Sequence, residues 1–270
     1  MPESIRIENV HDPRLSAYSR LRESKDALAS KGLFVTEGRL CVQRLIASDL
    51  QIESVVVQQG QESRIDACGK SFPVYSLDAN SIRQLVGFDF HRGILGCGRR
   101  PEFSALDSLS ITPGLPPVVL GVIGVDQHDN LGSMIRTASA LGINNVLVDS
   151  KTIDPYARRT IRVSMATVFQ QRMYLLTDPV NELRDLQSNS QFRVVATTID
   201  REATGLDDFR SDHRPVVLLV GSEANGLSHE IQNLASDRVC IPMELGTDSL
   251  NVSIAAAICM YGLTRGYSNR

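Results

Sequence analysis

The sequence predicts an α/β protein of two parts, and three observations lead to this class. Short apolar, β-branched runs alternate with stretches of helical periodicity, as in parallel sheets that helices cover on both faces. At 270 residues the chain exceeds the usual size of one compact core. Between the two parts, PEFSALDSLSITPGLPP at 101–117 has four prolines and little periodicity, which predicts a linker.

The first 100 residues predict a small α/β domain. Apolar residues at helical spacing over 12–32 predict an opening helix, and a second helix is expected over 37–50 with Leu40, Leu45 and Ile46 facing inward. Four short strands and the start of a third helix complete this domain; the strands are expected at 33–35, 54–57, 73–77 and 93–99, and the helix start near Asp78 or Ser81.

Residues 118–270 predict a second α/β domain with a mostly parallel sheet. Six buried strands are expected, with helical stretches between them. They are 118–125, 145–148, 173–176, 193–197, 216–221 and 238–241.

Composition narrows the class of protein. The formal net charge of −3 does not by itself indicate a nucleic-acid binder, but 24 of the 28 basic residues are arginines. A guanidinium grips phosphate in a bidentate way and stacks on bases, so RNA contact is one explanation, and a GC-rich genome is the other.

Other features exclude membranes, secretion and metals from the prediction. No apolar stretch approaches the roughly 18 residues of a spanning helix, and the acidic start, MPESIRIENVHDPR, is unlike a leader peptide. Five cysteines without a C-x-x-C pair predict reduced, buried thiols in a cytoplasmic protein. The five histidines are too scattered to indicate a metal site.

The segment NLGSMIRTA at 130–138 follows the first predicted strand of the second part. Free N–H groups at such a strand-to-helix turn can bind an anion or a carbonyl group. Arg136, about one and a half turns into the expected helix, is placed to reach back over the turn. The alternative is that Asn130 caps the helix and Arg136 is a surface cation.

The segment GSEANGL at 221–227 ends another predicted strand. Gly221 is expected to let a ligand approach the backbone, and Gly226 to permit a turn with positive φ. Glu223 either belongs to a site or begins a helix, where the positive end of the helix dipole favours an acidic residue. The glycine spacing matches neither a phosphate-binding loop nor a dinucleotide fold.

The segment IPMELGTDSLNVS at 241–253 combines apolar residues with a polar loop and opens an alanine-rich helix. Ile241, Met243 and Leu250 can wall a flat aromatic ring while the loop backbone supplies hydrogen bonds. This combination suits an adenine pocket.

In this order and at this spacing, the three segments resemble the signature motifs of the SpoU (TrmH) branch of the SPOUT superfamily, the S-adenosylmethionine-dependent RNA 2′-O-ribose methyltransferases. The resemblance runs from Val118 to near Arg265. More loosely, KGLFVTEG at 31–38 resembles the ribosomal-protein-like domain that precedes the catalytic domain in many rRNA-modifying members. Together, the two resemblances imply an RNA substrate-binding domain at 1–100, a linker at 101–117 and a methyltransferase domain at 118–270.

The resemblance also implies a deep C-terminal trefoil knot, a homodimer and S-adenosyl-L-methionine as methyl donor, without a metal. It assigns Gly221, Ile241 and Leu250 to the adenosine part of the donor. The polar residues that it assigns to catalysis or to support of the site are Asn130, Arg136, Glu223, Ser249 and Asn251, with Arg136 acting across the dimer interface.

The implied substrate is RNA, with 23S-type rRNA favoured by the N-terminal domain. The alternatives are a tRNA ribose methyltransferase, an antibiotic-resistance rRNA methyltransferase and an RNA-binding or assembly factor without catalysis. Two positions depart from the family pattern. Ser164-Met165-Ala166-Thr167 stands where the family has Ser-x-Gly-Ala, and Gly262 stands where a glutamate is common.

Overall fold

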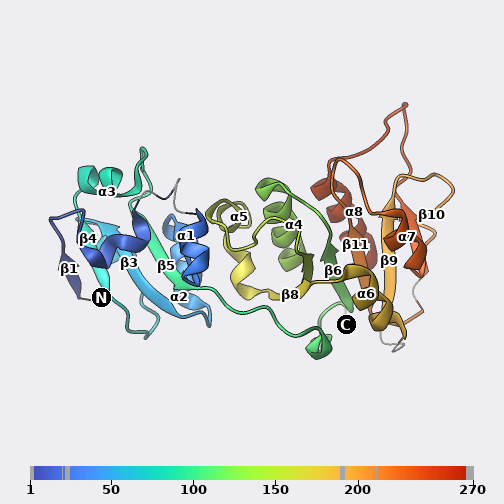
Figure 1. The fold of residues 1–270 in the computed structure, drawn as a ribbon, viewed down its shortest axis with the longest axis horizontal. Helices are drawn as coiled ribbons and strands as arrows, with labels where there is room; N and C mark the ends of the chain where they lie inside the picture. The colour runs from blue at the N-terminus through green and yellow to red at the C-terminus, as the bar shows by residue number, and fades with distance from the viewer. Residues whose placement is uncertain (1–2, 20, 22–24, 189–191, 211, 266–270) are drawn as a thin grey trace. The chain divides into compact units, whose positions relative to one another are not determined.

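The computed structural model divides into two compact units (Figure 1). It describes residues 3–19, 21, 25–188, 192–210 and 212–265. Unit 1 comprises Met1–Glu102 and Pro155–Phe169, and unit 2 comprises Phe103–Asp154 and Gln170–Arg270. The two units are defined by which residues pack together, and each contains two separate stretches of the chain. The predicted domains are continuous stretches of the chain, so their boundaries stay a prediction.

Unit 1 is built on a five-stranded sheet in the order β1-β4-β3-β5-β2. Its strands are β1 Ser4–Arg6, β2 Leu33–Glu37, β3 Ile52–Gln58, β4 Val74–Leu77 and β5 Ile94–Arg99. β5 runs antiparallel to β2 and β3, and the other pairs are parallel. The four predicted strands are confirmed. β1 was not predicted, because its three residues include a single apolar side chain.

Helices flank this sheet, and two predictions about them were wrong. The helices are η1 Pro13–Tyr18, α1 Lys25–Ser30, α2 Arg39–Ala47, η2 Glu62–Arg64, α3 Ala79–Val86 and α5 Arg158–Val163. Among the described residues the single opening helix is interrupted, because Ser19 is extended (ψ 130°) and ends η1; residues 20 and 22–24 of the predicted range lie outside the described residues. α2 begins after Gly38, since Glu37 extends β2, and Leu40 therefore faces solvent with 46% of its surface exposed. Leu45 and Ile46 are fully buried, as predicted.

The first departure from the family pattern lies in unit 1, where its backbone is unusual. Met165 and Ala166 have φ values of 54° and 63°, the left-handed region that favours glycine. Two hydrogen bonds hold this turn: Arg44 Nη1 donates to the Met165 carbonyl at 2.6 Å, and the Ala166 N–H donates to the Ile161 carbonyl at 2.7 Å. The family's glycine would adopt this conformation without the steric cost.

Unit 2 contains a parallel seven-stranded sheet in the order β10-β12-β9-β11-β6-β7-β8. Its strands are β6 Val118–Val122, β7 Asn145–Asp149, β8 Arg172–Leu176, β9 Arg193–Thr198, β10 Thr204–Gly205, β11 Val216–Val220 and β12 Asp237–Cys240. The six predicted strands and the mostly parallel sheet are confirmed. β10 was not predicted, because two residues are too short for a periodic signal.

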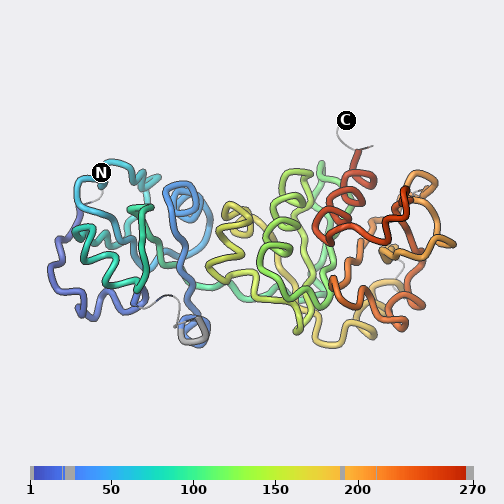
Figure 2. The backbone as a smooth tube through the Cα atoms, turned by 90° about the horizontal axis from the view of Figure 1, so that it is seen from above, coloured from blue at the N-terminus to red at the C-terminus, as the bar shows by residue number. Residues whose placement is uncertain are grey.

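Helices cover the two faces of this sheet in pairs (Figure 1). They are α4 His128–Ala140, α6 Pro179–Ser188, α7 His229–Leu234 and α8 Val252–Thr264, and unit 2 also contains the short helix η3 Leu106–Ser108. The short helix η4 Thr167–Gln170 begins in the part of the chain that belongs to unit 1. α6 and α7 pack over Val217 and Leu219 of β11. α4 and α8 lie side by side and cover the opposite face, as Figure 2 also shows. The knot implied by the resemblance stays a prediction.

β6 is shorter than predicted because the chain turns at Gly124. This glycine has φ +66°, and its N–H donates to Asp149 Oδ1 at 2.8 Å. The same Asp149 oxygen accepts from the Thr152 N–H and hydroxyl at 2.9 and 2.6 Å. Asp149 is buried, so these bonds fix the loop that leads from β6 into α4.

The second family departure, Gly262 on α8, is explained by its neighbour. A Cβ atom at this position would lie 3.1 Å from Leu206 Cδ2. Leu206 fills the space into which a glutamate stem would have to enter.

The cysteine prediction is confirmed for four residues and wrong for one. Cys41, Cys97, Cys240 and Cys259 are free and buried, but Cys68 is exposed and lies in a left-handed turn with φ +49°. Within the described residues, no helix is long and apolar enough to cross a membrane. The same residues contain no group of three or more His, Cys, Asp or Glu side chains placed to hold a metal ion.

Candidate active site

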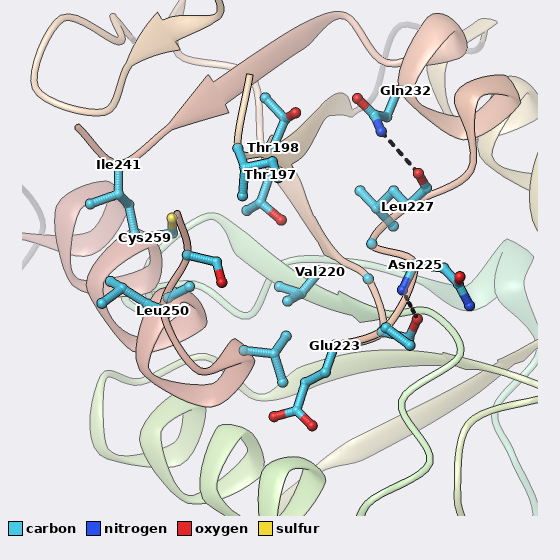
Figure 3. A pocket seen from close by; sticks show the side chains of 18 of the residues that line it. Thr197, Thr198, Val220, Glu223, Asn225, Leu227, Gln232, Ile241, Leu250 and Cys259 are labelled. Carbon is cyan, nitrogen blue, oxygen red and sulfur yellow. Dashed lines mark hydrogen bonds between the residues drawn. The ribbon is translucent and has the colours of Figure 1, made fainter. Parts of the chain in front are cut away.

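A pocket of about 730 Å³ opens in unit 2 where β9, β11 and β12 end (Figure 3). Ligands of open α/β sheets bind in such a crevice, outside the carboxyl ends of the strands. Six of the eight predicted site residues line it: Gly221, Glu223, Ile241, Ser249, Leu250 and Asn251. The second and third motifs therefore meet at one cavity, while Asn130 and Arg136 of the first motif do not line it.

Glu223 lies at the edge of this pocket and accepts three hydrogen bonds. Its Oε1 atom accepts from Asn130 Nδ2 at 2.7 Å and from Asn251 Nδ2 at 2.8 Å. Its Oε2 atom accepts from Gln127 Nε2 at 2.9 Å. In Figure 3 the Glu223 side chain points away from Gln232 and toward the green ribbon of α4. One carboxylate thus joins all three sequence motifs.

Asn251 is engaged within the protein at both ends of its side chain. It is the N-cap of α8, and its Oδ1 accepts from the N–H groups of Ser253 and Ile254 and from the Ser253 hydroxyl. Its Nδ2 donates to Glu223 and to Asn130 Oδ1, the latter at 3.1 Å. An amide group whose two donors and acceptor are occupied in this way supports the site.

Asn130 is buried inside α4 and is not its cap, so the helix-capping alternative was wrong. The N-cap is Gln127, three residues earlier. A second alternative was also wrong. Glu223 does not start a helix, because α7 begins at His229 with Ser228 as its cap.

Arg136 lies apart from this cluster. α4 begins at His128, so Arg136 is about two turns into the helix, further than predicted. Its side chain is exposed and does not line the pocket. Within the described part of the chain it makes no hydrogen bond or ion pair.

Gly221 lines the pocket, and the packing of the chain adds a second reason for a glycine at this position. A Cβ atom at this position would lie 2.2 Å from Gly226 C and 2.3 Å from Leu227 N. Both are backbone atoms of the loop that folds back over the end of β11. Gly226 has φ +61°, and the predicted turn with positive φ is confirmed.

The pocket has an apolar side and a polar side. Figure 3 shows Ile241, Leu250 and Cys259 grouped at the left, with Thr197 and Thr198 at the end of β9 to their right. The threonines were not among the predicted site residues. Their position at the end of a predicted parallel strand was the available signal, because strand ends of this kind share one edge.

Gln127 is a further residue that sequence reasoning missed. It lies three residues before the first motif and belongs to none of the three segments. Its contact with Glu223 joins positions 96 residues apart. Sequence periodicity carries no information on such a contact.

Cys259 is predicted to be unreactive although it lines the pocket. Burial raises its thiol pKa to about 12, and nearby Cys240 adds to the rise. The nucleophilic thiolate is therefore scarce at pH 8. We expect iodoacetamide to modify the exposed Cys68 of native protein while Cys259 stays unmodified, as measured by peptide mass spectrometry. In urea all five cysteines should react, and equal rates for Cys68 and Cys259 in native protein would contradict the expectation.

A parallel α/β sheet with a pocket at its carboxyl edge, and a carboxylate held by three amides at the rim of that pocket, is typical of an α/β enzyme. A family model described as the SpoU rRNA Methylase family matches residues 117–261. The chain belongs to the SpoU rRNA methylase family. The resemblance inferred from the three motifs is thereby confirmed.

Individual relatives agree with this assignment. An uncharacterized tRNA/rRNA methyltransferase of Mycobacterium bovis is 34% identical over 278 residues, which cover 98% of this chain and 94% of the relative. A 23S rRNA (guanosine-2′-O-)-methyltransferase of Acinetobacter baylyi is 30% identical over 200 residues, 71% of this chain and 78% of the relative. The crystal structure of an AdoMet-bound rRNA methyltransferase from Sinorhizobium meliloti shares the fold, with a TM-score of 0.82, 24% identity and coverage of 97% and 98%.

Proposed function

We propose that this protein transfers a methyl group from S-adenosyl-L-methionine to a ribose 2′-hydroxyl of RNA, with 23S-type rRNA as the substrate. The observation that carries the proposal is the Glu223 carboxylate, which joins Asn130 and Asn251 at the edge of the pocket. Family membership supports the reaction type, and the Acinetobacter baylyi relative supports the RNA class.

The pocket residues fit the donor. A volume of about 730 Å³ suits a ligand of this size, and Ile241 and Leu250 offer apolar walls to a flat ring. Ser249 lines the pocket, and its hydroxyl makes no hydrogen bond with the described residues, so it is available to a ligand. When bound, the donor supplies a methyl group on a positively charged sulfur. The AdoMet-bound neighbour from Sinorhizobium meliloti supports this choice.

Positioning is the main task of the protein in such a displacement. Asn130 and Asn251 both donate to Glu223 at the edge of the pocket, and Asn251 ties this group to the start of α8. The guanidinium group of Arg136 offers hydrogen-bond donors and a positive charge and has no acceptor atom. We therefore assign it to the ribose hydroxyl or the adjoining phosphate, where its charge stabilises the developing oxyanion.

A homodimer would bring Arg136 to a site. α8 presents an exposed apolar face at helical spacing, with Ile254, Ile258 and Tyr261 exposed by 52%, 39% and 62%. α4, which carries Arg136, packs beside it. A second copy of the chain would cover this face, and two-fold symmetry would then carry each arginine to the partner's pocket.

Mixing two inactive variants tests the shared site. We expect Arg136→Ala and Asn251→Ala proteins to recover activity when their protomers exchange, because each mixed dimer then has one complete site. Random exchange makes half of the dimers mixed, which gives about a quarter of wild-type activity. Methylation of rRNA with labelled donor is the readout. Absence of recovery in heterodimers proven by mass spectrometry would show that Arg136 serves its own chain.

The RNA target is tested in cells. We expect one 2′-O-methylated position in rRNA to disappear when the gene is deleted, with tRNA unchanged and the enzyme acting in the cytoplasm. Loss of a tRNA position would select the tRNA alternative, and changed antibiotic sensitivity would indicate a resistance role. No lost position, together with no donor binding by the purified protein, would indicate an RNA-binding factor without catalysis.

A further inference from the structure

Gln127 occupies the N-cap position of α4 but does not cap the helix. Its backbone has the extended angles of an N-cap (φ −106°, ψ 122°), yet its side chain makes no capping hydrogen bond. Caps are usually Ser, Thr, Asp or Asn, whose short side chains reach the first free N–H groups. The longer Gln127 side chain instead reaches Glu223 in the loop after β11.

This contact gives a hydrogen-bond donor to Oε2 of Glu223, the oxygen that receives none from Asn130 or Asn251. Asn130 and Asn251 both donate to Oε1. Among the described residues, Gln127 is the side chain that donates to Oε2, at 2.9 Å. The terminal torsion of a glutamate is soft, so a carboxylate bound through one oxygen can still rotate. A bond on each oxygen fixes its plane.

We propose that Gln127 is a positioning residue for methyl transfer, which acts through Glu223 to keep the amides of Asn130 and Asn251 oriented at the pocket. This rests on the proposed function, because it takes Asn130 and Glu223 as parts of the reacting site. Gln127 does not itself line the pocket, and it reaches the pocket through Glu223, which does. Its effect is therefore indirect and should appear in the chemical step.

The test uses Gln127→Met in the full-length protein, since methionine keeps the length of the side chain and removes the amide donor. We expect kcat for rRNA methylation to fall about tenfold, because a hydrogen bond to a carboxylate at an exposed site contributes roughly 1.4 kcal/mol. Donor affinity by calorimetry should stay within about threefold of wild type, because the pocket wall is unchanged. Gln127→Glu should lose more activity than Gln127→Met, since it sets a second negative charge against Glu223.

Gln187→Met is the matched control. It removes a hydrogen bond of the same length elsewhere in unit 2, the one that the Gln187 side-chain amide donates to Ser236 Oγ at 2.9 Å. We expect its kcat to equal that of wild type. If the Gln127 variant loses no more activity than this control, the positioning role is wrong.

A double-mutant cycle distinguishes action through Glu223 from a local effect on α4. In a Glu223→Ala background, Gln127→Met should have no further effect on single-turnover methyl transfer. A full additional tenfold loss there would overturn the proposal. Wild-type protein that methylates neither rRNA nor tRNA would overturn the proposed function and this inference with it. An active wild type with an unaffected Gln127→Met variant would overturn this inference alone.

Discussion

Arg136→Ala is expected to lower the rate of RNA methylation at least a hundredfold while S-adenosyl-L-methionine binding stays within about threefold of wild type. The arginine is exposed, lies outside the pocket and makes no hydrogen bond or ion pair with the described residues. Its removal should therefore change neither the donor site nor, beyond about 0.5 kcal/mol, the free energy of unfolding. Methylation assays and calorimetry measure the two effects separately.

Arg184→Ala is the control for the loss of one positive charge from the protein surface. Arg184 is also an exposed arginine on a helix of unit 2, and its hydrogen bond runs to Asn181 on the same helix. Near-normal methylation by this variant would show that loss of one positive charge is not sufficient. If Arg136→Ala loses donor binding as well as activity, the assignment of Arg136 to the acceptor is wrong.

Gly221→Ala is expected to damage both stability and donor binding. The new Cβ would lie 2.2 to 2.4 Å from three backbone atoms of Gly226 and Leu227. Backbone cannot move aside as a flexible side chain can, so the loop over β11 must shift. We expect a loss of about 3 kcal/mol or more in the free energy of unfolding, and a thermal midpoint lower by about 6–12 °C.

The displaced loop forms part of the pocket, so donor affinity measured by calorimetry should fall more than about a hundredfold. Gly226→Ala provides the comparison within the same loop. A Cβ at Gly226 meets no atom within 4 Å, and the cost is limited to its φ of +61°, about 1–2 kcal/mol. Equal stability and affinity of the two variants would contradict the steric argument.

Much of the fold could be predicted from local pattern. The six predicted strands of unit 2 contain short apolar runs, which are typical of a parallel sheet covered on both faces. Asp78 was expected near the start of α3, and its side chain caps that helix through the N–H groups of Asn80 and Ser81. The opening helix failed because periodicity over 12–32 does not register the extended backbone at Ser19.

The sequence predicted which residues belong to the candidate site better than it predicted how those residues are placed. The motif spacing placed Glu223 and Asn251 in one site, and the structure joins them by a hydrogen bond of 2.8 Å. The resemblance assigned Arg136 to the partner's site across a dimer interface, and in the single chain Arg136 lies outside the pocket. Whether a second copy completes the site is the question that the protomer-mixing experiment answers.

The sequence by itself determined the α/β class, the parallel sheet, the three motifs and the family, because each depends on residue type and short spacing. Only the tertiary structure decided why Gly221 must be a glycine and which oxygen of Glu223 each amide binds. It also placed Gln127 opposite Glu223. These facts depend on atoms brought together from residues up to 121 positions apart. Local pattern cannot encode such contacts, because their geometry is set by how the whole sheet and its helices pack.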